Sequence, residues 1–115
     1  MGKTTGLLFV VPVKDLDAAV RFYSEAFNLE EVFRAEGIVF VGIPGTDSAV
    51  GLLNDPGAAG NGPQNVGLHL DHALNLDDVV AEIERAGGTI VERGEHAPGV
   101  PFARVADPDG NVLEV

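Results

Sequence analysis

The stretch that decides the fold is residues 8–20, LFVVPVKDLDAAV, because its pattern returns sixty residues later in residues 68–80, LHLDHALNLDDVV. In each copy a short apolar-rich run leads to an Asp or Asn, which is followed by Leu and by apolar residues at helical spacing. This pattern predicts a strand followed by a helix with a capping side chain at its start. A repeat of this length indicates two copies of one structural unit.

The residues after the first copy predict the rest of this unit. Apolar residues recur every three or four positions from Leu16 to Phe27, so we expect a helix that ends near Asn28 and packs one stripe against a sheet. Three short extended pieces then follow, at residues 31–34, 38–43 and 49–53. The Pro- and Gly-containing stretch 54–65 has the composition of an exposed linker.

The second half predicts the same order of elements. Asn75 can cap a helix that runs from Leu76 to about Ala86, where two glycines stop it. A shift of sixty-two residues pairs Phe40 with Phe102 and Leu52 with Glu114. We therefore predict an α+β fold in which two βαβββ repeats form a curved mixed sheet around a groove, with the helices on the outer face. A single domain of residues 1–115 would contain repeat one at about 5–54, a linker at about 55–65 and repeat two at about 66–115.

The composition excludes several classes of protein. A chain of 115 residues with 45% hydrophobic residues can bury one core, and the absence of cysteine excludes disulfides and a cysteine nucleophile. The 7 basic and 18 acidic residues give a net charge of −11, which repels phosphate and anionic lipid. We expect no nucleic acid or membrane as a partner. With no membrane-spanning run and no secretory cleavage pattern, a cytoplasmic location is the expectation.

Three segments carry a resemblance to a known family: residues 13–23 (VKDLDAAVRFY), 86–88 (AGG) and 107–114 (DPDGNVLE). Together they resemble the vicinal oxygen chelate superfamily, which includes glyoxalase I, bleomycin resistance proteins, fosfomycin resistance proteins and extradiol dioxygenases. The resemblance covers nearly the whole chain and implies a homodimer, but one fold of this kind hosts many chemistries. We interpret Asp-Pro-Asp-Gly as a turn between strands and not as a pair of catalytic acids.

In the metal-using members, the resemblance implies ligands from the first and last strands of each repeat. Carried over to this chain, these positions are Leu8, Leu52, Leu68 and Glu114. Three leucines cannot donate lone pairs, and a single carboxylate does not hold a divalent ion against water. We therefore expect no cofactor and a largely apolar ligand-binding groove.

The histidines leave an alternative open. Side chains alternate along a strand, so His72 shares a face with Leu68 and would line the groove, whereas His69 points the other way. A slip of one residue would exchange these faces, so a divalent metal, if one is present, would be held by His69, His72 and Glu114. His96 stands beside Ala-Pro-Gly, and we expect it in a solvated loop and not as a general base.

Three functions follow from these features. The leading hypothesis is a protein that binds a small organic molecule, which could be cationic, in a groove lined by Leu8, Leu52, Leu68, His72 and Glu114, without a metal. The alternative is a metal-dependent lyase, isomerase or dioxygenase with the shifted ligand set. The third hypothesis is an interaction domain whose groove is filled by its own side chains. Whether the chain catalyses a reaction stays open at this point.

Overall fold

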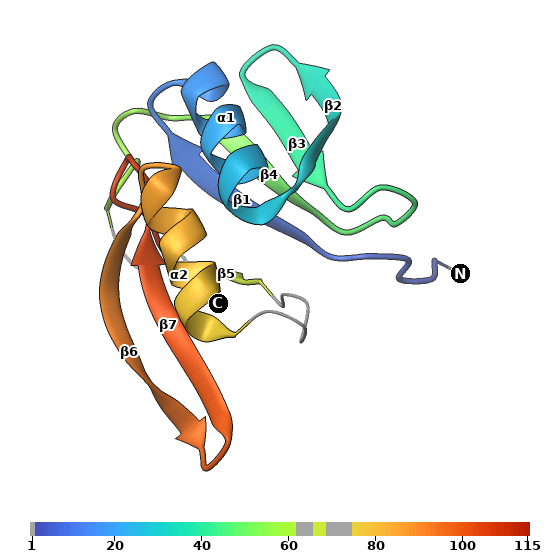
Figure 1. Cartoon of the computed structure of the whole chain (residues 1–115). Coiled ribbons are helices and arrows are strands. Elements are labelled where there is room, and N and C mark those ends of the chain that lie inside the picture. The colour runs from blue at the N-terminus through green and yellow to red at the C-terminus, as the bar shows by residue number, and fades with distance from the viewer. Residues whose placement is uncertain (1, 62–65, 69–74) are drawn as a thin grey trace.

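The computed structural model describes residues 2–61, 66–68 and 75–115. In these residues two helices and eight strands follow one another in the order of two βαβββ modules (Figure 1). The first module contains β1 (Leu8–Val13), α1 (Leu16–Phe27), β2 (Glu30–Ala35), β3 (Ile38–Gly42) and β4 (Ala49–Asn54). The second contains β5 (Val66–Gly67), α2 (Leu76–Arg85), β6 (Thr89–Ala97), β7 (Val100–Ala106) and β8 (Val112–Glu114). The predicted α+β class and both βαβββ repeats are confirmed.

The strands form two four-stranded mixed sheets, one in each module. Sheet A has the order β1-β4-β3-β2 and sheet B the order β5-β8-β7-β6, so the same topology occurs twice. In both sheets the first strand of the module runs parallel to the last one, and the other neighbours are antiparallel. The strands thus belong to two separate sheets and not to one continuous sheet around a groove.

The helix starts follow from the residues that were expected to cap them. The Asp15 carboxylate accepts a hydrogen bond from the Ala18 N–H at 3.0 Å, and the Asn75 side chain accepts one from the Asp78 N–H at 2.9 Å. Each bond satisfies a backbone donor that the first helical turn leaves free. α1 ends where Asn28 adopts a left-handed conformation with φ of 56°, which ends the helical hydrogen-bond pattern.

The two modules share one hydrophobic core. Each helix lies over its own sheet (Figure 1), α1 and α2 contact each other, and a single cluster of buried side chains runs through both modules. From α1 this cluster takes Ala19, Phe22, Tyr23, Ala26 and Phe27. None of the helices in the described ranges is long and apolar enough to cross a membrane.

Strand register fixes which side chains of sheet A face this core. Val11 and Val13 of β1 are fully buried, and Val11 lies beside the fully buried Leu52 of β4. Leu8 and Val10 point to the opposite side of the sheet, where each is about half exposed. We call this second side the open face of sheet A; its apolar residues include Leu8, Val10, Phe33, Ile38, Phe40 and Leu53.

Candidate ligand-binding site

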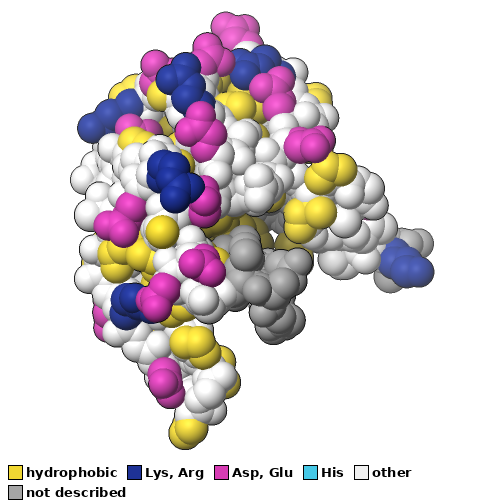
Figure 2. Space-filling model, viewed as in Figure 1, with side chains coloured by type: hydrophobic (Ala, Val, Ile, Leu, Met, Phe, Trp, Pro, Cys, Tyr) yellow, Lys and Arg dark blue, Asp and Glu magenta, His cyan; other side chains and the backbone are white. Residues whose placement is uncertain are grey.

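A cleft of about 450 Å³ lies between the first module and strand β5 of the second. Its walls come from the start of β1, the end of α1, the turn between β3 and β4, and β5. The lining residues are Leu7, Phe9, Phe27, Asn28, Leu29, Val41, Gly42, Ile43, Pro44, Ser48, Ala49, Val50, Gly67 and Leu68. Figure 2 shows hydrophobic side chains around the hollow between the two modules.

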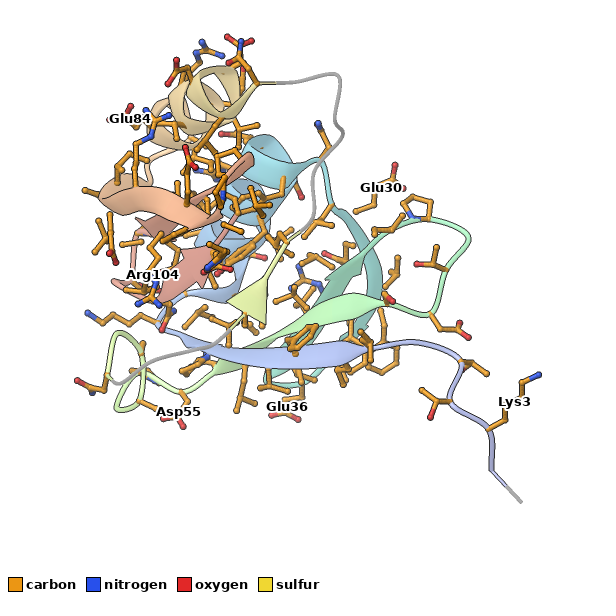
Figure 3. All side chains as sticks on the ribbon, turned by 90° about the horizontal axis from the view of Figure 1, so that it is seen from below. Lys3, Glu30, Glu36, Asp55, Glu84 and Arg104 are labelled. Atoms are coloured by element: carbon orange, nitrogen blue, oxygen red, sulfur yellow. The ribbon has the colours of Figure 1, made fainter. Side chains whose placement is uncertain are left out.

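The cleft is apolar from its floor to its rim. Val41 and Val50, at 0% and 3% exposure, form the floor, and Ile43 at 53% stands at the rim. Among the lining residues within the described ranges, only Asn28 and Ser48 have polar side chains, and none is charged. The charged side chains labelled in Figure 3, such as Glu30, Asp55 and Glu84, lie at the periphery of the protein. The cleft can therefore hold an apolar body and offers little to fix an ion.

A cluster of polar and aromatic side chains lies on sheet B. His96 Nε2 lies 3.0 Å from Glu114 Oε2, and the His96 ring stacks on Phe102 with 4.2 Å between ring centroids and 15° between ring planes. Because a carboxylate only accepts hydrogen bonds, Nε2 of the imidazole carries the hydrogen. The Glu114 and His96 side chains are 38% and 51% exposed, so both remain accessible to solvent.

The structure separates the residues that the sequence placed in one groove. Leu8 lies on the open face of sheet A, whereas Leu52 is fully buried against the core on the other face. Leu68 packs against the core and lines the cleft. Glu114 lies on sheet B beside His96. His69 and His72 lie outside the described residues.

The expectation that His96 lies in a loop is wrong. His96 belongs to β6, which extends to Ala97, and it does not lie in a solvated loop. The Ala-Pro-Gly stretch favours a loop in the sequence, but the β6–β7 hairpin turns tightly there, with Ala97 paired to Val100.

In the described parts of the chain, the side chains that could coordinate a metal ion are too few to form a site. No group of three or more His, Asp or Glu side chains comes together in those parts, and the chain has no cysteine. Leu8, Leu52 and Leu68 present only carbon where the resemblance would need ligands. Glu114 and His96 supply two donors, which is fewer than zinc or calcium sites normally take from a protein.

The Asp-Pro-Asp-Gly segment is confirmed as a turn with a structural role. It connects β7 to β8, and the buried Asp107 carboxylate accepts four hydrogen bonds. Their donors are the Tyr23 hydroxyl at 2.9 Å, the backbone N–H of Asp109, and the backbone and side-chain N–H groups of Asn111. The Asn111 side chain also donates to the Pro12 carbonyl at 2.7 Å. This turn therefore joins the second module to α1 and β1.

Comparison with known proteins gives one family. The family model described as Glyoxalase/Bleomycin resistance protein/Dioxygenase superfamily matches residues 7–115. None of the curated proteins compared with this chain matches it.

Solved structures of the same shape include an antibiotic binding protein from Streptomyces sp. CB03234, which is 25% identical with a TM-score of 0.75 over 99% of this chain and 95% of that one. A superfamily member from Sphaerobacter thermophilus DSM 20745 is 21% identical with a TM-score of 0.76, covering 97% and 95% of the two chains. A bleomycin resistance determinant encoded on transposon Tn5 is 22% identical with a TM-score of 0.71, covering 96% and 95%. The last two similarities show the fold.

Proposed function

Because the chain belongs to the Glyoxalase/Bleomycin resistance protein/Dioxygenase superfamily, we propose that it binds a small organic molecule in the apolar cleft, without a metal and without a chemical reaction. The observation that carries the proposal is a cleft of about 450 Å³ in which none of the described lining residues has a charged side chain. Pockets that hold drug-sized ligands have volumes of roughly 300–1,000 Å³ and mostly apolar walls.

Two further observations support binding over catalysis. The structurally similar Streptomyces protein is described as an antibiotic binding protein. Among the lining residues that the structure describes, the polar side chains are those of Asn28 and Ser48, and neither is a carboxylate, an imidazole or an amine. The net charge of −11 favours the approach of neutral or cationic molecules over anionic ones.

The experiment is a thermal-shift screen of antibiotics and apolar metabolites, followed by calorimetry on any compound that stabilises the protein. Phe9 is the variant of choice because it lines the cleft and is 36% exposed. If a ligand covers that part of a side chain of roughly 200 Å², about 70 Å² leaves water, which is worth about 1.8 kcal/mol. Phe9→Ala should then weaken binding about 20-fold.

Val91→Ala is the control, because Val91 is an exposed apolar residue of β6 outside the cleft. It should leave the affinity unchanged. A library in which no compound raises the melting temperature, or equal losses of affinity in the two variants, would contradict binding in the cleft.

We further propose that the protein forms a homodimer that buries the open face of sheet A. Leu8, Val10 and Phe33 are 48–50% exposed on that face, and contiguous exposed apolar surface of this kind is typical of interfaces. Val10→Glu should reduce the mass measured by light scattering from a dimer to a monomer. Val91→Glu, on the far module, should not. A monomeric wild-type protein at micromolar concentration would contradict the dimer.

A further inference from the structure

The β6–β7 hairpin projects beyond the rest of sheet B. Within the described ranges, β8 pairs with β7 from Arg104 to Ala106, and two hydrogen bonds, at 3.1 and 2.9 Å, join Ala103 to Val115. Among the same residues, the part of β7 before Ala103 has β6 as its one strand partner. Figure 1 shows the turn of the hairpin at the end of the molecule that lies away from sheet A. The turn is therefore accessible to a second molecule.

The outermost part of the hairpin is apolar and rigid. We call residues 97–101, with the sequence APGVP, the hairpin tip; all of them are exposed, and none is charged. Hairpin turns normally carry polar residues because they face water. The two prolines fix their own φ angles, and Gly99 has a φ of 80° that favours glycine. The tip therefore loses little conformational freedom when it binds a partner.

The open face of sheet A is an apolar surface that matches this tip. Its positions in β1, β3 and β4 carry no charged side chain, and Leu8 and Val10 are about half exposed there. Each copy of the chain has a net charge of −11, so two copies repel each other wherever their carboxylates would meet. A contact between copies requires surfaces without acidic groups, and both the hairpin tip and these strands of the open face meet this requirement.

The tip and the open face belong to different modules. Because they lie toward opposite ends of the molecule (Figure 1), the tip of a chain does not cover the open face of the same chain. Two copies related by a twofold axis can form this contact twice, with each copy giving its tip and receiving that of the other. Such an arrangement is closed, so it stops at two copies.

The apolar area on the two surfaces is sufficient for a dimer. Leu8, Val10, Phe33 and Val100 are 48–50% exposed, and a half-exposed side chain of this size presents roughly 80 Å² to water. With Leu53 and the other apolar residues of the tip, each copy presents roughly 500 Å². Two copies would therefore bury about 1,000 Å², which reaches the lower limit for a specific interface.

We infer that the homodimer forms by a reciprocal contact, in which the hairpin tip of each copy docks on the open face of sheet A of the other copy. This inference rests on the homodimer proposed above and names the surface that covers its open face. Neither Val10 nor Val100 lines the cleft, so the binding of small molecules there does not depend on this contact.

The first test is Val100→Glu, with the mass measured by light scattering at micromolar concentration. The variant should be a monomer, with a dissociation constant at least about 100-fold higher, because an unpaired carboxylate would be buried at both contacts. Val91→Glu is the matched control, since Val91 is 55% exposed on the same hairpin but outside the tip, and it should stay a dimer. All these positions are exposed, so urea unfolding should show wild-type midpoints.

The second test asks whether the two surfaces touch. Val10→Glu and Val100→Lys should each dissociate the dimer, whereas the double variant should dimerise at least about tenfold more tightly than either, because opposite charges then meet at both contacts. Val10→Glu combined with Val91→Lys is the control. It has the same net charge as the double variant and should stay a monomer.

The outcomes separate the inference from the proposed homodimer. If the wild-type protein is a monomer, the homodimer fails and the inference fails with it. If Val100→Glu stays a dimer while Val10→Glu does not, the homodimer stands and the tip takes no part in it. A double variant that is no tighter than the single ones, or a wild-type mass that grows beyond a dimer with concentration, also overturns the reciprocal contact.

Discussion

Raising the pH above the ordinary range of tyrosine should destabilise this protein through a single hydroxyl group. Tyr23 is fully buried, and its hydroxyl donates to the Asp107 carboxylate at 2.9 Å. Burial, and then the negative charge of Asp107, raise the pKa of Tyr23 well above its ordinary value of 10.0. The folded protein therefore keeps this proton at pH values where the unfolded chain releases it.

The sign and size of the effect follow from proton linkage. The stabilisation is fully present below pH 10.0, the ordinary value for the unfolded chain, and is lost as the pH rises above it. One proton gives about 1.4 kcal/mol of unfolding free energy for each pH unit. Tyr23→Phe lacks the proton and should show none of this loss. At neutral pH the variant should lose only about 1 kcal/mol, because Asp107 keeps three other donors.

The assay is urea unfolding of both proteins from about pH 8 to pH 11, in which the lysine contributions are common to both and cancel in the difference. Absorbance at about 295 nm reports tyrosinate directly; the chain has one Tyr and no Trp, so the signal belongs to Tyr23. Tyrosinate should form only as the protein unfolds. Ionisation in the folded protein with a midpoint near 10, or equal losses of stability in the two proteins, would refute the reasoning.

Three further outcomes are expected. Asn111→Asp should lower the unfolding free energy by about 3 kcal/mol or more, because it replaces a fully buried donor by an acceptor beside Asp107. Urea unfolding measures this loss of stability, and a loss below about 1 kcal/mol would contradict the prediction. Gly60→Ala should cost about 2 kcal/mol or more, because φ is 77° and the new Cβ would collide with the Asp109 carbonyl, whereas Gly57→Ala should be nearly neutral. A chelator such as EDTA, or added zinc, should leave the melting temperature unchanged; a shift of several degrees would indicate a metal site.

Local features of the sequence predicted a large part of the fold. Asp15 and Asn75 cap the two helices as expected, and the turn at Asp107 connects two strands. These features depend on contacts between residues that are close in the chain, so the local pattern carries the information. The sixty-residue repeat added the order of the elements, because two similar segments fold into similar modules.

The same reasoning could not assign faces. Alternation along a strand gives only which residues share a side, and the register with neighbouring strands decides which side meets the core. The repeat offsets paired Leu52 with Glu114, but Leu52 is fully buried in sheet A and Glu114 is partly exposed in sheet B. The histidine partner of Glu114 was missed because His96 is eighteen residues away and reaches it across β7 and a register irregularity near the hairpin.

The sequence by itself determined the repeated module, its helix caps and its turns, because these follow from neighbouring residues. It also determined a net negative charge that repels polyanions. Only the tertiary structure decided that the cleft forms between the first module and β5, and that His96, Phe102 and Glu114 meet on sheet B. Such sites need segments far apart in the chain to pack together, and packing of that kind depends on the whole core at once.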